Sequence, residues 1–95
     1  MEFADRGTED IFDGVDSGRA RKTLPRQLHD KAQNKLAILA FADSLDDLRV
    51  PPSNHLEKLR GDRSGQHSIR INDRYRICFV WGAGQATDVE IVDYH

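Results

Sequence analysis

The feature that most constrains this chain is a change in the spacing of its apolar residues. From residue 67 onward, apolar and polar side chains alternate over 67–71, 75–81 and 89–93. Alternation with a period of two is typical of strands that bury one face. The turn-forming stretches Asn72-Asp73 and Gly82-Ala83-Gly84 separate these segments. With a further short strand expected within 56–59, the pattern predicts a meander of three or four antiparallel strands.

The residues before this meander follow helical spacing instead. The longest predicted helix runs from about residue 25 to 42, where apolar residues recur every three or four positions and Lys35 lies on the polar face. A shorter helix is predicted over 8–14 with Thr8 as its cap, and 15–23 is expected to be a loop. Helices followed by strands indicate an α+β fold, with two N-terminal helices packed on a twisted antiparallel sheet.

Length and composition narrow the class of protein. The chain has 95 residues, of which 38% are apolar and 32% charged, so we expect residues 1–95 to form one globular domain. No apolar run approaches the roughly 18–20 residues of a membrane span, and the N-terminus does not resemble a signal peptide. The single cysteine, Cys78, fits a reducing cytoplasm. No CxxC or HExxH spacing is present, so we expect no structural zinc site, and no glycine-rich motif offers a cradle for a nucleotide cofactor.

The distribution of charge is uneven although the net charge is only −2. Residues 1–18 are acidic, whereas 19–35 and 58–76 are basic. If the hairpin around Asn72 buries its apolar residues on one face, Arg70 must lie opposite Arg76 on the other face. Like charges placed opposite each other destabilise a sheet. The pair therefore predicts either an anion between the guanidinium groups or neutralisation by water and a nearby acid such as Glu90.

Three segments of the C-terminal half resemble a known family. They are Leu59–Asp73, Tyr75-Arg76-Ile77 and Asp88–His95, the last of which ends in Asp-Tyr-His. These segments are similar to the HigB toxins of bacterial toxin–antitoxin pairs, which belong to the RelE/ParE superfamily and are close to the GraT-like plasmid maintenance killer proteins. The N-terminal Asp-Arg-Gly-Thr-Glu and the helical segment 35–39 agree more loosely.

The resemblance implies a type II toxin with the RelE-like microbial ribonuclease fold. It implies ribosome-dependent endonucleolytic cleavage of mRNA in the decoding site, without a metal or cofactor, and hence inhibition of translation. It also implies a cognate HigA-type antitoxin with a helix-turn-helix, and contact with operator DNA only through that antitoxin.

The resemblance and the chemistry of RNA cleavage together suggest roles for individual residues. Cleavage needs a base for the 2′-hydroxyl, cations for the phosphoryl oxygens and an acid for the leaving 5′-oxygen. The catalytic residues predicted on this basis are Arg60, Arg76, Asp93, Tyr94 and His95. The predicted RNA-binding residues are Lys58, Arg63, Arg70 and Arg74. Along the last strand, Asp93 and His95 should share one face while Tyr94 points to the other.

Two positions depart from the pattern of the family. Many relatives have lysine where Arg60 stands, and arginine does not donate a proton at accessible pH. Some relatives have histidine where Glu57 stands, which leaves Glu57 as a base or leaves that function absent. These departures and the low net charge keep an alternative open, in which the chain is a degenerate, non-catalytic module that binds RNA or the antitoxin and acts in operon autoregulation. A ribonuclease that needs no ribosome is a third reading.

Overall fold

The computed structural model describes residues 1–94 and contains one four-stranded sheet. The strands are β1 (Glu57–Lys58), β2 (His67–Arg70), β3 (Tyr75–Gly82) and β4 (Gln85–Asp93). They lie in the order β1-β2-β3-β4, and every neighbouring pair is antiparallel. The predicted meander is therefore confirmed, with four strands.

Helical segments precede the sheet and also interrupt its first connections. The α-helices are α1 (Arg6–Phe12), α2 (Gly18–Thr23) and α3 (His29–Phe41). The short 3-10 turns are η1 (Arg26–Leu28), η2 (Leu45–Arg49), η3 (Pro52–Asn54) and η4 (Gly61–Arg63). The α+β class is confirmed, but there are three α-helices where two were predicted.

The additional helix is α2, which occupies much of the predicted loop 15–23. Ser17 caps it by accepting a hydrogen bond from the backbone N–H of Ala20 at 3.0 Å, and Ala20 is fully buried. Asp10 of α1 accepts hydrogen bonds from Ser17 at 2.6 Å and Arg19 at 3.2 Å, which ties α2 to α1. The basic cluster of this segment therefore belongs to a helix, because the polar contacts to Asp10 compensate for its weak apolar pattern.

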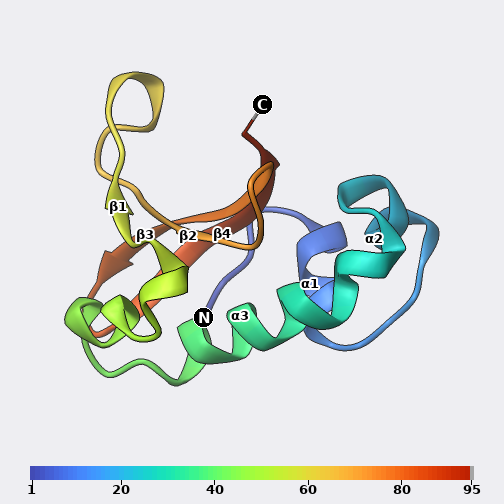
Figure 1. Cartoon of the computed structure of the whole chain (residues 1–95), viewed down its shortest axis with the longest axis horizontal. Coiled ribbons are helices and arrows are strands. Elements are labelled where there is room, and N and C mark those ends of the chain that lie inside the picture. The colour runs from blue at the N-terminus through green and yellow to red at the C-terminus, as the bar shows by residue number, and fades with distance from the viewer. Residues whose placement is uncertain (95) are drawn as a thin grey trace.

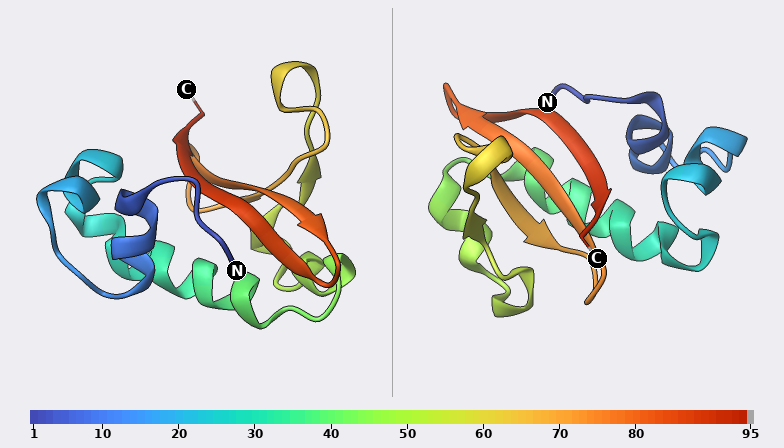
Figure 2. Two further views of the ribbon diagram at one scale, coloured as in Figure 1. Left: turned by 180° about the vertical axis from the view of Figure 1, so that it is seen from behind. Right: turned by 90° about the horizontal axis from the view of Figure 1, so that it is seen from above.

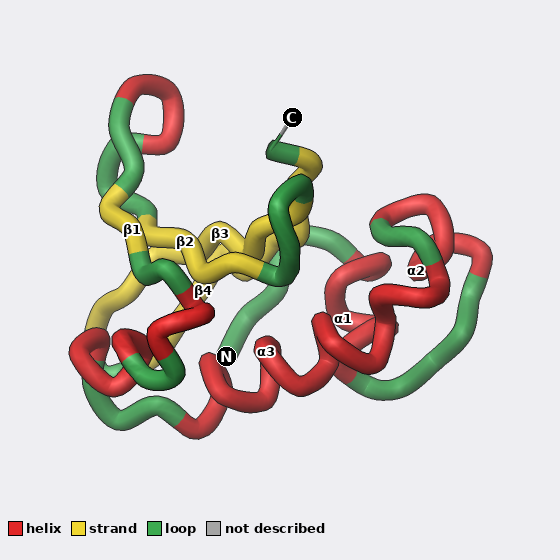
Figure 3. The backbone as a smooth tube through the Cα atoms, viewed as in Figure 1, coloured by secondary structure: helices red, strands yellow, loops and turns green. Residues whose placement is uncertain are grey.

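The molecule has two layers, with α3 packed beneath one face of the sheet (Figure 1). The core lies between them and is formed mainly by aliphatic side chains of α3, β3 and β4, with Ile69 of β2, around Phe79. The opposite face, which we call the outer face, carries no helix. Both the η4 segment and the C-terminal end of β4 rise on the side of this face (Figure 3). The fold thus leaves one side of the sheet open between two projecting segments.

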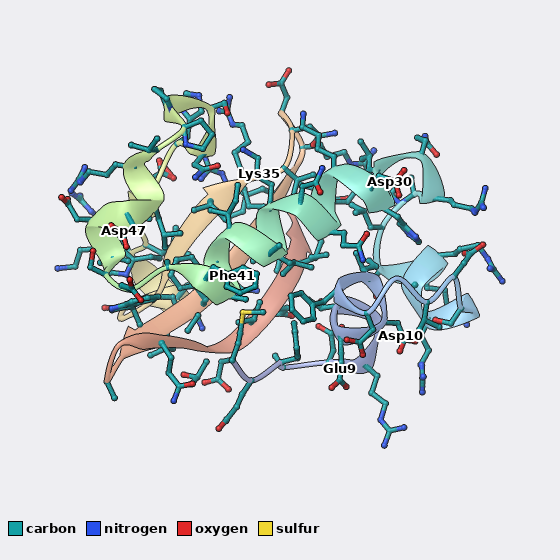
Figure 4. The ribbon with its side chains drawn as sticks, turned by 90° about the horizontal axis from the view of Figure 1, so that it is seen from below. Glu9, Asp10, Asp30, Lys35, Phe41 and Asp47 are labelled. Carbon is teal, nitrogen blue, oxygen red and sulfur yellow. The ribbon has the colours of Figure 1, made fainter. Side chains whose placement is uncertain are left out.

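Lys35 is not on the polar face of α3 as predicted. It is 8% exposed, and its ammonium group donates a hydrogen bond to Asn54 Oδ1 at 2.6 Å. Phe41, by contrast, is 85% exposed on the side of α3 that faces away from the sheet (Figure 4). Helical spacing places Lys35 next to apolar residues, and the η3 segment supplies the polar partner that the sequence pattern does not reveal.

The N-terminus is tied to the last strand. Phe3 forms a parallel bridge with Val89, so the N-terminal segment runs beside β4 (Figure 2). Asp5, not Thr8, is the N-cap of α1. Thr8 is fully buried instead, and its hydroxyl accepts a hydrogen bond from the backbone N–H of Ile91 at 3.1 Å. These contacts fix the position of the strand that leads to Tyr94.

Candidate active site

The hairpin between β2 and β3 has the register that the apolar residues predict. Arg70 lies directly opposite Arg76, and the neighbouring pairs Ile69–Ile77 and His67–Phe79 lie on the core side. Arg76 in turn is opposite Val92 of β4. Two residue pairs along the strands, the outer face carries a second row that crosses all four strands, formed by Glu57, Ser68, Cys78 and Glu90.

Arg76 is the best-anchored polar side chain on the outer face. It is 8% exposed, more buried than its expected place on an open sheet face implied. Its Nη1 donates to Ser68 Oγ at 2.7 Å and to the backbone carbonyl of His55 at 3.4 Å. The same nitrogen lies 3.4 Å from Glu57 Oε2. All three contacts hold one corner of the guanidinium, so its orientation is set before any ligand arrives.

The other edge of this guanidinium is formed by Nε and Nη2. Within residues 1–94, no hydrogen-bond partner is found for Nε or Nη2 of Arg76, whose contacts all involve Nη1. Nε and Nη2 form the pair of parallel N–H donors that binds a phosphate or carboxylate in bidentate fashion. The Arg76 Cζ also lies 5.3 Å from the ring centroid of Tyr94, which is 47% exposed. The structure thus places a prepared cation beside an accessible aromatic ring.

Glu57 contributes a carboxylate to the same site. Its side chain is 54% exposed while its Oε2 contacts Arg76 Nη1. A carboxylate beside an arginine-bound phosphate can accept a proton from a neighbouring hydroxyl. Glu57 was considered only as a departure from the family pattern, and strand pairing with Ser68 now explains how it reaches Arg76.

A second cation reaches the outer face from η4. Arg63 Nη1 lies 3.2 Å from Glu90 Oε1 and also donates to Gln66 Oε1 at 3.1 Å. This bridge lies near Cys78, whose thiol is fully buried and whose pKa is raised by that burial. A thiol that stays protonated is a poor nucleophile, so Cys78 has a packing role here.

Asp93 lies apart from Arg76, although both were predicted to act together. It pairs with Tyr75 across the sheet, whereas Tyr94 lies over Arg76, so the predicted opposite orientation of Asp93 and Tyr94 is confirmed. The Asp93 carboxylate accepts two hydrogen bonds from Arg74 Nε, each 3.1 Å, and one from Nη2 at 2.8 Å. These bonds raise the pKa of the Arg74 guanidinium. His95 lies outside the described residues.

The remaining predicted residues differ in how far their side chains are exposed. Arg60 and Lys58 are exposed, Arg60 at the start of η4 and Lys58 in β1. Arg70 is 34% exposed at its side chain, and its Nη1 lies 3.7 Å from Asp73. Its Nε is buried without a hydrogen-bond partner within the described part of the chain. Within residues 1–94, no hydrogen bond or ion pair joins any of these three side chains to Arg76.

Ser68 is a site residue that the sequence reasoning missed. Its hydroxyl is fully buried and makes the shortest contact to Arg76. The sequence does contain a signal for Ser68, because the alternation of His67–Arg70 places it on the same face as Arg70. A lone serine in a strand is usually unremarkable, and only the register shows that it faces an arginine.

Residues 1–94 contain no group of three or more histidine, cysteine, aspartate or glutamate side chains arranged to hold a metal ion. Nor does any helix within that range have the length and apolar character needed to cross a bilayer.

The architecture matches that of a solved structure. The YoeB–YefM complex from Staphylococcus aureus contains a chain that superposes with a TM-score of 0.62, covering 99% of this chain and 93% of that chain at 17% sequence identity. At this level of identity the likeness shows a shared fold, in which helices pack on one face of a four-stranded antiparallel sheet.

Sequence comparison identifies the family. The family model described as "RelE-like toxin of type II toxin-antitoxin system HigB" matches residues 1–95, and the chain belongs to this HigB-like toxin family. Toxin HigB-1 of Vibrio cholerae is 35% identical over 86 residues, which are 90% of this chain and 87% of the relative. Endoribonuclease HigB of Proteus vulgaris is 31% identical over 94 residues, which are 98% and 96% of the two chains.

Proposed function

We propose that this protein is a ribosome-dependent, metal-independent mRNA endoribonuclease that inhibits translation. The observation that carries the proposal is the Arg76 guanidinium, which is fixed through Nη1 and leaves Nε and Nη2 for an anion. A relative that matches nearly the whole chain is named an endoribonuclease, which supports RNA as the substrate. Family membership supports the role of a toxin, which would act in the cytoplasm.

The proposed reaction is an internal transesterification of RNA. The 2′-oxygen attacks the adjacent phosphorus, the bond to the 5′-oxygen breaks, and a 2′,3′-cyclic phosphate remains. Arg76 binds the non-bridging oxygens and stabilises the charge that grows on them. Glu57 accepts the 2′-hydroxyl proton, and His95 donates a proton to the leaving 5′-oxygen. Tyr94 stacks on a base of the substrate, since its ring is half exposed beside Arg76.

The surrounding basic residues would hold the rest of the RNA. We propose that Arg60 contacts the phosphate next to the scissile one, and that Lys58, Arg63, Arg70 and Arg74 bind flanking mRNA phosphates or ribosomal RNA. Asp93 acts on this surface by orienting Arg74 through its three hydrogen bonds. Such phosphate contacts make binding weaken steeply with salt.

We also propose that the partner of the free toxin is a HigA-type helix-turn-helix antitoxin. Membership of a toxin–antitoxin family supports an antitoxin, and the matching structure is a complex of the related toxin YoeB with YefM. Contact with operator DNA would then occur through the antitoxin alone.

The experiment that tests this function maps mRNA ends by primer extension after purified protein is added to translating ribosomes. Naked mRNA and a chelator-treated reaction run in parallel. We expect cuts only on translated mRNA, phased by codon and unchanged by chelator. Cuts on naked mRNA would contradict ribosome dependence, and loss of cleavage in chelator would contradict metal independence.

One observation favours a second function. Glu57 and Glu90 lie within 3.4 Å and 3.2 Å of Arg76 and Arg63, so each of these cations already has an acidic neighbour. A site neutralised in this way suits a non-catalytic module that binds RNA or the antitoxin and serves only autoregulation. Folded, antitoxin-free protein that gives no cuts but binds antitoxin normally would favour this alternative.

A further inference from the structure

A buried polar cluster connects the helical layer with the backbone that holds Arg76. Its centre is Asn54, the last residue of η3, which is fully buried. Asn54 Nδ2 donates to the backbone carbonyls of Leu48 at 3.1 Å and Val50 at 3.3 Å. Its Oδ1 accepts from Lys35 Nζ at 2.6 Å. The amide of Asn54 therefore uses both ends to join η2, η3 and α3.

Lys35 is an unusual partner for such a position. It is 8% exposed, and within residues 1–94 no carboxylate lies within ion-pair distance of its ammonium group. Its other polar contact is Ser53 Oγ at 3.4 Å. Burial lowers the pKa of Lys35, with Lys31 adding to the effect. Burying an ammonium group without a counter-ion costs free energy, and an exposed lysine on the helix surface would not incur this cost.

The cluster leads directly to the guanidinium of Arg76. His55 follows Asn54 and has a left-handed backbone, with φ 45° and ψ 56°, a conformation that is uncommon for residues other than glycine. The His55 carbonyl accepts a hydrogen bond from Arg76 Nη1 at 3.4 Å, and two residues later Glu57 Oε2 lies 3.4 Å from the same nitrogen. Two of the three groups that hold Arg76 thus come from the turn that begins at Asn54.

We propose that Asn54 and Lys35 are positioning residues for Arg76, acting through the turn at His55 that presents a carbonyl and the Glu57 carboxylate to Nη1. The inference rests on the proposed function, in which Arg76 binds the scissile phosphate. Lys35 holds the Asn54 amide in place, and this amide holds the turn. Loosening the cluster displaces the guanidinium from the phosphate, and a misplacement of about 1 Å can cost up to about 100-fold in rate.

The test compares Lys35→Met with Lys31→Met, which changes an exposed lysine of the same helix. Single-turnover cleavage is measured on translating ribosomes well below the melting temperature of each protein. We expect Lys35→Met to lower the maximal rate by about 10- to 100-fold, with little change in the ribosome concentration at half-maximal rate. Lys31→Met should stay within about twofold of the unmodified protein. Asn54→Ser is the second variant if Lys35→Met does not fold, with the same expectation.

A double-mutant cycle separates positioning from general stability. In an Arg76→Ala background, Lys35→Met should change the residual rate by less than about twofold, because the group it positions is gone. An equal fold-loss in both backgrounds would overturn the proposal, as would an unchanged rate in the Arg76-containing protein.

A second readout does not depend on cleavage. The side-chain NMR signal of Arg76 in ¹⁵N-labelled full-length protein, assigned with Arg76→Lys, reports how the guanidinium is held. We expect this signal to shift or broaden in Lys35→Met and to remain unchanged in Lys31→Met. An unmoved signal would overturn the positioning role. If the unmodified protein cleaves no RNA but the signal moves as expected, the proposed function fails while the structural link holds.

Discussion

Replacing Ser68 with alanine removes the shortest contact to Arg76, and its effect on stability can be estimated from the geometry. The Ser68 hydroxyl and the Arg76 guanidinium are both buried and lie 2.7 Å apart. A hydrogen bond to a charged group contributes about 1.5–3 kcal/mol. Arg76 Nη1 keeps two longer contacts in the variant, each 3.4 Å, so we expect a loss near the lower limit, about 1.5 kcal/mol. For a domain of this size that corresponds to a fall in melting temperature of about 6–12 °C.

The assay is urea unfolding of four proteins in a double-mutant cycle with Arg76→Met. In the Arg76→Met background, Ser68→Ala removes a hydroxyl that has already lost its partner, so its cost should fall to about zero. Ser64→Ala, at an exposed serine after η4, is the matched control and should stay within about 0.5 kcal/mol of the unmodified protein. An equal loss for Ser68→Ala in both backgrounds would refute the coupling inferred from the structure.

Three further predictions concern parts of the fold that support the site. Thr8→Val leaves the buried N–H of Ile91 without its acceptor, so urea unfolding should show a loss of about 1–3 kcal/mol, with Thr8→Ser close to the unmodified protein. Gly7→Ala should cost about 1–3 kcal/mol in the same assay, because a Cβ at position 7 would collide with the Thr23 hydroxyl, and full stability would contradict the close packing of α1 and α2. Burial lowers the pKa of His67, so below about pH 6.5 the unfolded chain binds the proton more readily and stability falls as the pH drops. His67→Gln should flatten the dependence of unfolding free energy on pH between 7 and 5, and an unchanged slope would exclude this cause.

The sheet and its register could be predicted because each strand buries a regular set of apolar residues. Once Ile69 and Ile77 are assigned to the core, alternation leaves Arg70 and Arg76 opposite each other, as the structure confirms. The same parity correctly separates Asp93 from Tyr94. Register depends on local periodicity, which a single sequence carries.

The predictions for α2 and Lys35 were wrong because each depends on a contact with another segment of the chain. The helix α2 depends on the hydrogen bonds of Asp10 with Ser17 and Arg19, and no local pattern in 15–23 indicates these bonds. Lys35 is buried because Asn54, nineteen residues later, offers its amide oxygen. Neither partner can be identified from spacing along the chain.

The cations of the candidate site could be predicted from the sequence. The groups that orient these cations were harder to predict. Arg76 was singled out from its strand and from the family resemblance, whereas its three anchors come from Ser68, the His55 carbonyl and Glu57. A backbone carbonyl carries no sequence signal, and the left-handed conformation of His55 is uncommon for any residue other than glycine. The roles of the predicted catalytic residues remain predictions for experiment.

The most direct test of a phosphate site at Arg76 is the single-turnover cleavage rate of Arg76→Ala on translating ribosomes. Arg21→Ala, which removes an exposed arginine of α2, serves as the matched control. We expect Arg76→Ala to reduce the rate by about 100-fold or more, a loss typical of removing one preorganised donor to a charged transition state, while the control changes it little. Both variants must be shown to be folded at the assay temperature. A folded Arg76→Ala protein that cleaves mRNA at the unmodified rate would contradict the central role assigned to Arg76.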